Sequence, residues 1–175
     1  MGFLLLLFVS FVLLGVPLDY IALQGNHLGS WRIFLELFTH QLGHANLSHL
    51  LGNYMFVAPY ALYVEHKLGT KNFLKYFFVC GLLAAGTQVL AFDRVNLIGS
   101  SGADFGIFAM ACALFNRTKW DRLASFLLLG FSVMLQFIAA THNLLAPVAY
   151  WAHFGGALGG LALVHFFVIP SQSRS

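Results

Sequence analysis

The chain has 175 residues, of which 59% are hydrophobic and only 9% are charged, whereas an ordinary soluble domain carries about 25% charged residues. Its mean hydropathy is +0.81. This composition excludes a soluble globular enzyme, a disordered chain and a disulfide scaffold. The net charge of +3 comes from scattered residues that form no basic face, so we expect no nucleic-acid partner. The sequence predicts an all-α membrane protein with a single domain, residues 1–175, in contact with the lipid bilayer.

Six apolar stretches approach the roughly 20 residues that a helix needs to cross a bilayer core of about 30 Å. They predict membrane-spanning helices at about residues 3–18, 48–64, 73–92, 101–115, 123–140 and 150–169. The first stretch has the apolar character of a signal peptide, but it lacks a basic flank and a small-residue cleavage site before Asp19. We therefore favour a first membrane helix, and the missing flank leaves open that the natural chain begins further upstream.

Basic residues are distributed unevenly between the loops that join these stretches. Seven of the nine lysines and arginines lie in or beside the second loop, the fourth loop and the C-terminal tail: Lys67, Lys71, Lys75, Arg117, Lys119, Arg122 and Arg174. The positive-inside rule places these loops and both termini in the cytoplasm. Loops 1, 3 and 5 then face outward. Loop 1 is long, and the apolar spacing between Trp31 and Leu42 predicts an amphipathic segment in the outer interface.

Polar groups at membrane depth are costly, so each of them is a candidate for function. His49 and Asn53 lie four residues apart, and a helix places them on one face. There, two hydrogen-bond donors fit either an oxyanion site or a polar contact between helices. Ser101 opens the fourth stretch within Gly-x-Ser-Gly. This serine fits either a nucleophile or an ordinary N-cap.

His153 opens a glycine-rich segment of the sixth stretch. Two overlapping GxxxG pairs follow it, at Gly155, Gly156, Gly159 and Gly160. Such pairs allow another helix to approach closely, and the fourth stretch has small residues of its own at Gly102 and Gly106. Contact between the two faces would bring His153 to the hydroxyl of Ser101, as a general base requires. A purely structural histidine is the alternative.

Taken together, these motifs resemble the rhomboid family of intramembrane serine proteases, over about residues 3–169. The resemblance rests on HxxxxHxxxN (His44, His49, Asn53), GxSG (Ser101), His-x-Gly-Gly (His153) and the pair Trp31-Arg32. It implies a six-transmembrane-helix rhomboid-like bundle with a long outer loop 1. It also implies a cavity open to outside water, capped by loop 5 (about residues 141–149), with the fifth span as a lateral gate.

The resemblance also implies roles for individual residues. Ser101 is the nucleophile and His153 the general base of a Ser-His dyad. His49 and Asn53 are oxyanion-hole donors, and the structural motif residues are Trp31, Arg32 and His44. Ser100 could replace Ser101 only after a slip in register, which would turn the hydroxyl by about 100° on a helix. No metal and no cofactor are implied.

Asp104 and Phe105, which follow the nucleophile on the same predicted helix, are candidates for tuning the site. Phe105 matches an aromatic residue that packs under the histidine in the family. Asp104 departs from the family pattern, which favours an apolar or small residue one helical turn after the serine. Two interpretations of Asp104 stay open. The first is a local hydrogen bond or a position facing the cavity, and the second is a role in tuning the dyad or recognising the substrate.

The expected function is a serine endopeptidase that cleaves transmembrane or membrane-anchored proteins near the outer membrane face. The alternative is a catalytically silent rhomboid-like protein that binds membrane clients. A small transporter or redox protein is less favoured, because the sequence shows no inverted repeats. A zinc metalloprotease is disfavoured by the absence of an HExxH motif. The remaining histidines are expected to be solvated in loops or at span ends: His27, His40, His66, His142 and His165.

The compact size and the absence of a recognisable transit peptide favour a multi-pass protein of a bacterial inner membrane. The oligomeric state and the natural substrate stay open, as does the choice between a housekeeping protease and one dedicated to a C-terminal sorting tail.

Overall fold

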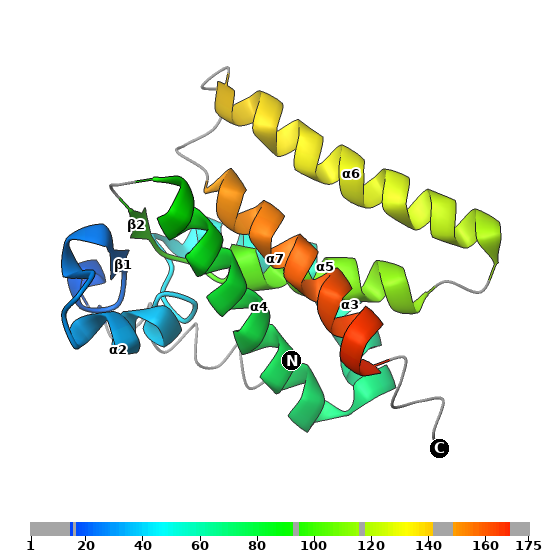
Figure 1. Cartoon of the computed structure of the whole chain (residues 1–175), viewed down its shortest axis with the longest axis horizontal. Coiled ribbons are helices and arrows are strands. Elements are labelled where there is room, and N and C mark those ends of the chain that lie inside the picture. Colours follow the sequence, from blue (N-terminus) through cyan, green and yellow to red (C-terminus); the bar gives the residue numbers. More distant parts are fainter. Residues whose placement is uncertain (1–14, 16, 93–94, 116–117, 142–148, 169–175) are drawn as a thin grey trace.

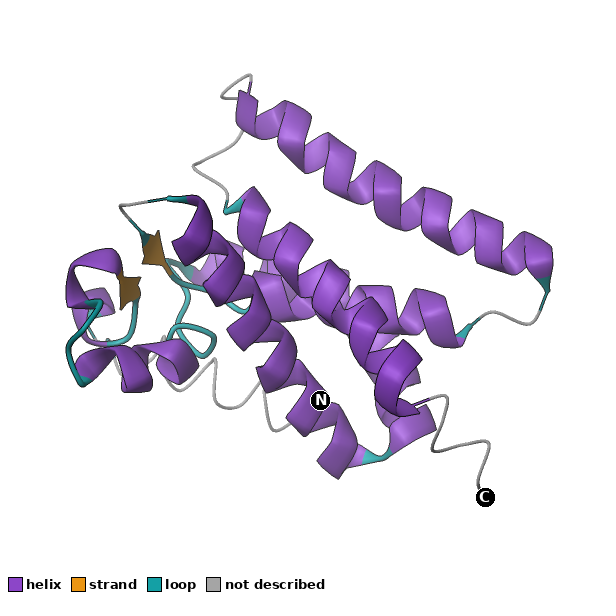
Figure 2. Ribbon diagram, in the orientation of Figure 1, coloured by secondary structure: helices purple, strands orange, loops and turns teal. Residues whose placement is uncertain are grey.

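The computed structural model describes residues 15, 17–92, 95–115, 118–141 and 149–168. Nearly all of the first predicted span, 3–18, and most of loop 5 lie outside these described residues. The chain is helical over most of the described part (Figure 2). The five long helices are α3 (Leu47–Leu68), α4 (Thr70–Ala91), α5 (Ser101–Leu114), α6 (Lys119–Thr141) and α7 (Tyr150–Leu163), which continues into a π-helical turn, η3 (Val164–Val168).

These helices correspond to the second through sixth predicted stretches. By length and composition, two of the described helices could cross a membrane, Thr70–Ala91 and Tyr150–Val168, and Ser101–Leu114 is a shorter apolar helix. The six-span arrangement as a whole stays a prediction. The helices extend beyond the second and third predicted spans, because α3 runs to Leu68 and α4 begins at Thr70. Gly69, with φ +78°, makes the whole turn.

Loop 1 contains several short elements before α3. They are two 3₁₀ turns, η1 (Leu18–Tyr20) and η2 (Gly25–His27), the strand β1 (Leu23–Gln24) and the helix α2 (Arg32–Thr39). β1 pairs antiparallel with β2 (Asn96–Leu97) of loop 3, with Leu23 opposite Leu97. Loops 1 and 3 therefore lie at the same end of the bundle (Figure 1). This agrees with the prediction that both loops face the same side of the membrane.

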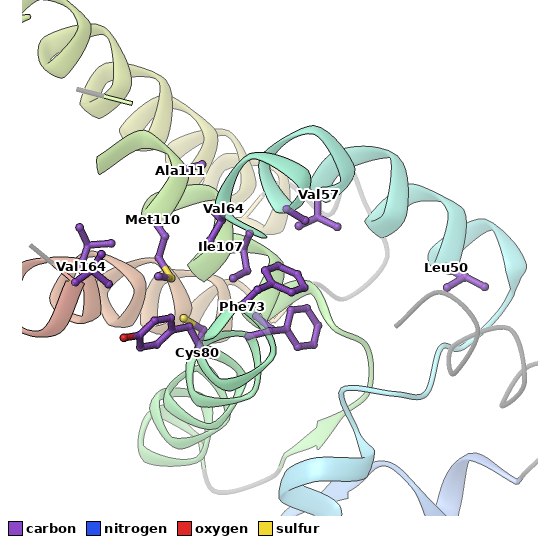
Figure 3. Close-up of a cluster of buried hydrophobic side chains, with 14 residues drawn as sticks. Leu50, Val57, Val64, Phe73, Cys80, Ile107, Met110, Ala111 and Val164 are labelled. Atoms are coloured by element: carbon purple, nitrogen blue, oxygen red, sulfur yellow. The ribbon is translucent and has the colours of Figure 1, made fainter. Parts of the chain in front are cut away.

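α5 is the central helix, in contact with α3, α4, α6 and α7. Every residue from Gly102 to Cys112 is buried, as expected for a helix that is apolar on all sides. Figure 3 shows Ile107 and Met110 of this helix among side chains of α3, α4 and η3, including Val64, Phe73 and Val164. α5 is thus held from all sides, and its first residue, Ser101, has a fixed position.

Glycine lets α7 pack against the backbone of α5. A Cβ atom added to Gly156 would overlap the carbonyl oxygen of Gly102, and one added to Gly160 would overlap that of Gly106. Any side chain at these positions would push the two helices apart. The predicted contact between the small faces of the fourth and sixth stretches is confirmed.

The second GxxxG pair of α7 faces a different helix. A Cβ atom on Gly155 would collide with Thr87 of α4, and one on Gly159 would lie 2.6 Å from Cδ1 of Leu83. The two overlapping pairs therefore serve two neighbours, α5 and α4, which together hold α7 in place.

α6 runs along the edge of the bundle (Figure 1), in contact with α5 and α7. Among its side chains that the structure describes, Leu129 is the only buried one. Phe126 and Phe131 are about half exposed. Exposed apolar surface of this extent is unusual for a protein in water and is ordinary for a helix in contact with lipid.

Glu36, a residue that the sequence analysis did not single out, anchors α2 within loop 1. Its side chain is 1% exposed. It lies 2.6 Å from Nδ1 of His27, accepts from the backbone N–H of Gln24 at 3.2 Å, and lies 3.7 Å from Nε of Arg32. These contacts fasten α2 to β1, while Trp31 at the start of α2 is 70% exposed. The predicted amphipathic character of this segment is confirmed.

The expectation that His40 is solvated is wrong. His40 is 2% exposed, its Nδ1–H donates to the carbonyl oxygen of Glu36 at 2.7 Å, and its own carbonyl accepts from the N–H of Gly99 at 2.8 Å. Burial lowers the pKa of His40 from 6.5 to about 4. His40 therefore links loop 1 to the segment that leads into α5.

We predict that Gly156→Ala destabilises the protein by about 1–3 kcal/mol, the usual cost of overpacking, because the added methyl group meets backbone atoms of α5. Gly86→Ala is the matched control, since a Cβ atom there has nothing within 4 Å. The control should be neutral or stabilising. Thermal unfolding in detergent measures both, and equal unfolding temperatures would contradict the close contact.

A second prediction concerns pH. Between pH 6.5 and about 4, the unfolded chain binds a proton at His40 that the folded chain does not bind, so stability falls as the pH falls through this range. His40→Gln removes this titration. A plot of unfolding temperature against pH should therefore be flatter for the variant than for the parent. Parallel plots would show that His40 is not buried in its neutral form.

Candidate active site

Ser101 and His153 come together at the ends of two helices. Ser101 is the first residue of α5, and His153 lies in the first turn of α7. Oγ of Ser101 lies 2.7 Å from Nε2 of His153. This is the distance at which an imidazole can take a proton from a hydroxyl. Ser101 is partly exposed, whereas His153 is 6% exposed.

One direct contact and two indirect contacts position the imidazole. Phe105 of α5 stacks on the ring of His153, with 4.7 Å between centroids and 14° between planes, as the resemblance implies. Phe56 of α3 stacks in turn on Phe105 at 5.0 Å. Gln88 of α4 accepts from the backbone N–H of Ala152 at 3.2 Å. The ring of His153 is therefore positioned by α3, α4 and α5 together.

His49 and Asn53 lie on the first turns of α3, which begins at an N-cap, Asn46, whose side chain accepts from the N–H of His49 at 2.8 Å. A Cβ atom added to Gly99 would lie 2.9 Å from Cε1 of His49 and 3.6 Å from Nδ2 of Asn53. Gly99 also has φ +120°, where a side chain would be strained. Both donors therefore lie against the backbone two residues before Ser101.

A buried polar cluster lies behind these donors. Nε2 of His44 is 3.1 Å from Nδ2 of Asn53 and 3.5 Å from Oγ of Ser100. The hydroxyl of Ser100 donates to Oδ2 of Asp104 at 2.9 Å. The first interpretation of Asp104, a local hydrogen bond, matches this geometry. The structure also gives Ser100 a part that the sequence analysis did not foresee.

His44 is a neutral member of this cluster. It precedes α3 and is 4% exposed. Burial, and then the nearby charge of His49, lower the pKa of His44 from 6.5 to about 3. The rings of His44 and His49 meet edge to face, with centroids 5.1 Å apart.

Arg32 contributes to the fold of loop 1, whereas the side chain of Trp31 is exposed and its structural role stays a prediction. Nη2 of Arg32 donates to the carbonyl oxygen of Asp19 at 3.4 Å, and Arg32 lies four residues before the buried Glu36. That spacing, on an otherwise apolar helix, is the signal by which Glu36 could have been recognised. Gln88 could have been recognised in the same way, as a strongly polar residue of an apolar stretch.

In the part of the chain that the structure describes, no group of three or more His, Cys, Asp or Glu side chains is placed to hold a metal ion. The arrangement at the head of α5 combines a hydroxyl, an imidazole in contact with it and two nearby side-chain donors. Such a set suits acyl transfer, in which a nucleophile, a general base and a stabilised oxyanion are needed.

Comparisons with known proteins identify the family of this chain. The family model of the Rhomboid domain matches residues 28–170. The chain is 29% identical over 140 residues to Rhomboid-like protease 3 of Toxoplasma gondii, a match covering 78% of this chain and 51% of that protein. It is 32% identical over 151 residues to "Putative rhomboid protease YdcA" of Bacillus subtilis (strain 168), covering 82% and 70%.

A third relative is Rhomboid-like protein 11, chloroplastic, of Arabidopsis thaliana, which is 30% identical over 135 residues, covering 69% of this chain and 48% of the relative. The chain thus spans about half the length of the Toxoplasma and Arabidopsis proteins. The match of the family model covers most of the chain, including all the motifs at the site. The chain belongs to the rhomboid family of integral membrane proteins.

Proposed function

We propose that this protein is an intramembrane serine endopeptidase that cleaves transmembrane or membrane-anchored proteins near the outer membrane face. The observation that carries the proposal is the 2.7 Å contact between Oγ of Ser101 and Nε2 of His153. These residues lie on different helices and are 52 positions apart in the sequence. Two side-chain donors lie beside the same segment, which supports the assignment of a reaction that generates an oxyanion.

The reaction proceeds in two stages. Ser101 attacks the peptide carbonyl carbon while His153 accepts the hydroxyl proton. The tetrahedral intermediate collapses to an acyl-enzyme, and His153 returns the proton to the departing amine. In the second stage His153 deprotonates a water molecule, the water oxygen attacks the ester, and Ser101 recovers its proton as the carboxylic acid product leaves. The dyad thus begins and ends in the same state.

Stabilisation of the oxyanion is assigned to His49, Asn53 and the backbone at the head of α5. The first N–H groups of a helix have no partner within the helix, and Ser101 occupies that position in α5. The side chains of His49 and Asn53 lie against Gly99, immediately before this helix end. Hydrogen-bond donors whose positions are fixed before the reaction stabilise an oxyanion most strongly where water is scarce.

The length of α5 indicates the depth of the site. Its 14 residues span about 21 Å at 1.5 Å per residue, less than the roughly 30 Å of the bilayer core. In the proposed six-span arrangement both termini and loops 2 and 4 lie in the cytoplasm, so the C-terminal end of α5, which leads into loop 4, lies at the cytoplasmic surface. The first residue of the helix, Ser101, then lies below the outer surface. The peripheral position of α6 is compatible with lateral entry of a membrane-spanning substrate beside this helix.

We predict that Ser101→Ala and His153→Ala each reduce cleavage of a tagged model membrane substrate in liposomes by about four orders of magnitude or more, the usual effect of losing a nucleophile or its base. Ser101→Ala should also abolish labelling by a fluorophosphonate. Ser132→Ala is the matched control, because Ser132 lies on α6 with its hydroxyl bound to the carbonyl of Leu128. That variant should cleave and label like the parent.

The labelling experiment separates the two functions that the sequence leaves open. Labelling of Ser101 without cleavage of the model substrate would identify a protease of narrow specificity. If folded parent protein neither cleaves nor labels, the protease proposal fails, and a protein that binds membrane clients takes its place.

The proposed oxyanion donors give a separate prediction. His49→Ala and Asn53→Ala should each lower kcat by about 10²–10³-fold with little change in KM, because the lost hydrogen bond forms mainly in the transition state. Asn72→Ala removes an exposed amide of α4 that donates to the carbonyl of Leu68, and it should leave kcat unchanged. A rise in KM at constant kcat would assign His49 and Asn53 to substrate binding.

A further inference from the structure

Asp104 is the least expected residue of the site. Its carboxyl group is 1% exposed, on a helix whose other buried members are apolar or small. Oδ2 accepts the hydroxyl of Ser100, and Oδ1 has no hydrogen-bond partner among the described residues. Burial of a carboxyl group with so few partners costs free energy. Its hydrogen bond is to Ser100, whose Oγ lies 3.5 Å from Nε2 of His44. Asp104 therefore adjoins the residues that hold Asn53.

The hydrogen-bond directions follow from the donors available. Nδ2 of Asn53 can only donate hydrogen bonds. Its partner at 3.1 Å, Nε2 of His44, must therefore be the acceptor. Ser100 has one hydroxyl proton, which it gives to Asp104. The 3.5 Å between Oγ of Ser100 and Nε2 of His44 is long for a hydrogen bond. Asp104 thereby keeps the Ser100 hydroxyl turned away from His44.

His44 can accept because its ring is neutral. Burial lowers the pKa of His44 to about 3, so one ring nitrogen carries no proton at physiological pH. That nitrogen is Nε2, and it holds one of the two N–H groups of Asn53. Fixing one N–H of a planar amide also fixes the direction of the other. Nδ2 of Asn53 lies beside Gly99, on the path to Ser101.

We infer that Asp104 is a positioning residue, which holds the Ser100 hydroxyl so that Nε2 of His44 accepts from, and orients, the oxyanion donor Asn53. Without Asp104, the hydroxyl of Ser100 turns to Nε2 of His44 and competes with the amide of Asn53 for the same lone pair. Asn53 then loses its fixed orientation, and the oxyanion is stabilised less well. This inference rests on the proposed protease function for its kinetic consequences only, because the hydrogen-bond competition exists whether or not the protein is active.

The first test is a comparison of Asp104→Val in two backgrounds. In the parent, Asp104→Val should lower kcat by about tenfold with KM unchanged, a partial loss of what a whole oxyanion donor contributes. In a Ser100→Ala background the competing hydroxyl is absent, so the same substitution should have no effect on kcat. Such strong non-additivity is the signature of residues that act through one another. Equal effects in the two backgrounds would overturn the inference.

Asp104→Asn supplies the conservative control. Its side-chain oxygen can still accept the hydroxyl of Ser100, so kcat should stay within about twofold of the parent. Valine is apolar and fits a buried site, so the unfolding temperature of Asp104→Val should not fall below that of the parent. If Asp104 had a purely structural role, the substitution would lower the unfolding temperature. If Asp104→Asn is as slow as Asp104→Val, the hydrogen bond to Ser100 is not what matters and the inference fails.

A spectroscopic measurement keeps the test independent of activity. The side-chain amide of Asn53 can be assigned by NMR in ¹⁵N-labelled protein through its loss in Asn53→Ala. Its resonance should shift or broaden in Asp104→Val and return to the parental position in the double variant with Ser100→Ala. An unchanged resonance in Asp104→Val overturns the inference even if the parent proves inactive. If the parent shows no cleavage that is lost in Ser101→Ala, only the proposed function is overturned.

Discussion

The close contact between the backbones of α5 and α7 is the constraint on which the site depends. Gly102 and Gly156 meet without side chains between them. Ser101 lies one residue before Gly102, and His153 lies three residues before Gly156. A wider separation of the helices would remove the hydrogen bond between Ser101 and His153. The same contact brings Phe105 under the imidazole, so packing and chemistry share one set of small residues. The remaining helices surround this pair and fix its position.

A second set of contacts, outside the helical bundle, supports the segment that enters α5 beside His49 and Asn53. The pairing of β1 with β2 and the hydrogen bond from Gly99 to His40 join loop 1 to the segment that enters α5. Glu36 fastens α2 to the same region. Loop 1 therefore acts as a scaffold for the head of α5. Its long sequence is explained by these contacts, since a simple connector would need far fewer residues.

The sequence by itself determined the positions of the helices and the residue types at the site. Apolar length located the helices α3 to α7, because the composition of a membrane helix is a local property. The spacing of His49 and Asn53 predicted that they share one face of a helix, and the two GxxxG pairs predicted a close contact between helices. The helices α3 and α4 continue beyond the apolar stretches, through their charged ends to Gly69, because apolar composition ends before a helix does.

Only the tertiary structure decided which polar groups meet. His40 is buried rather than solvated, Glu36 is an anchor, and Ser100 connects Asp104 to the neighbourhood of His44. The contacts of His40, Glu36 and Ser100 join segments that are distant in the chain or lie in irregular loops. The contact between Ser100 and Asp104 is the exception. Periodicity reports which face a residue occupies but not which atom it faces. For this protein, the sequence therefore determined the elements and the candidate chemistry, whereas the fold decided the partners, because partners are set by packing between helices.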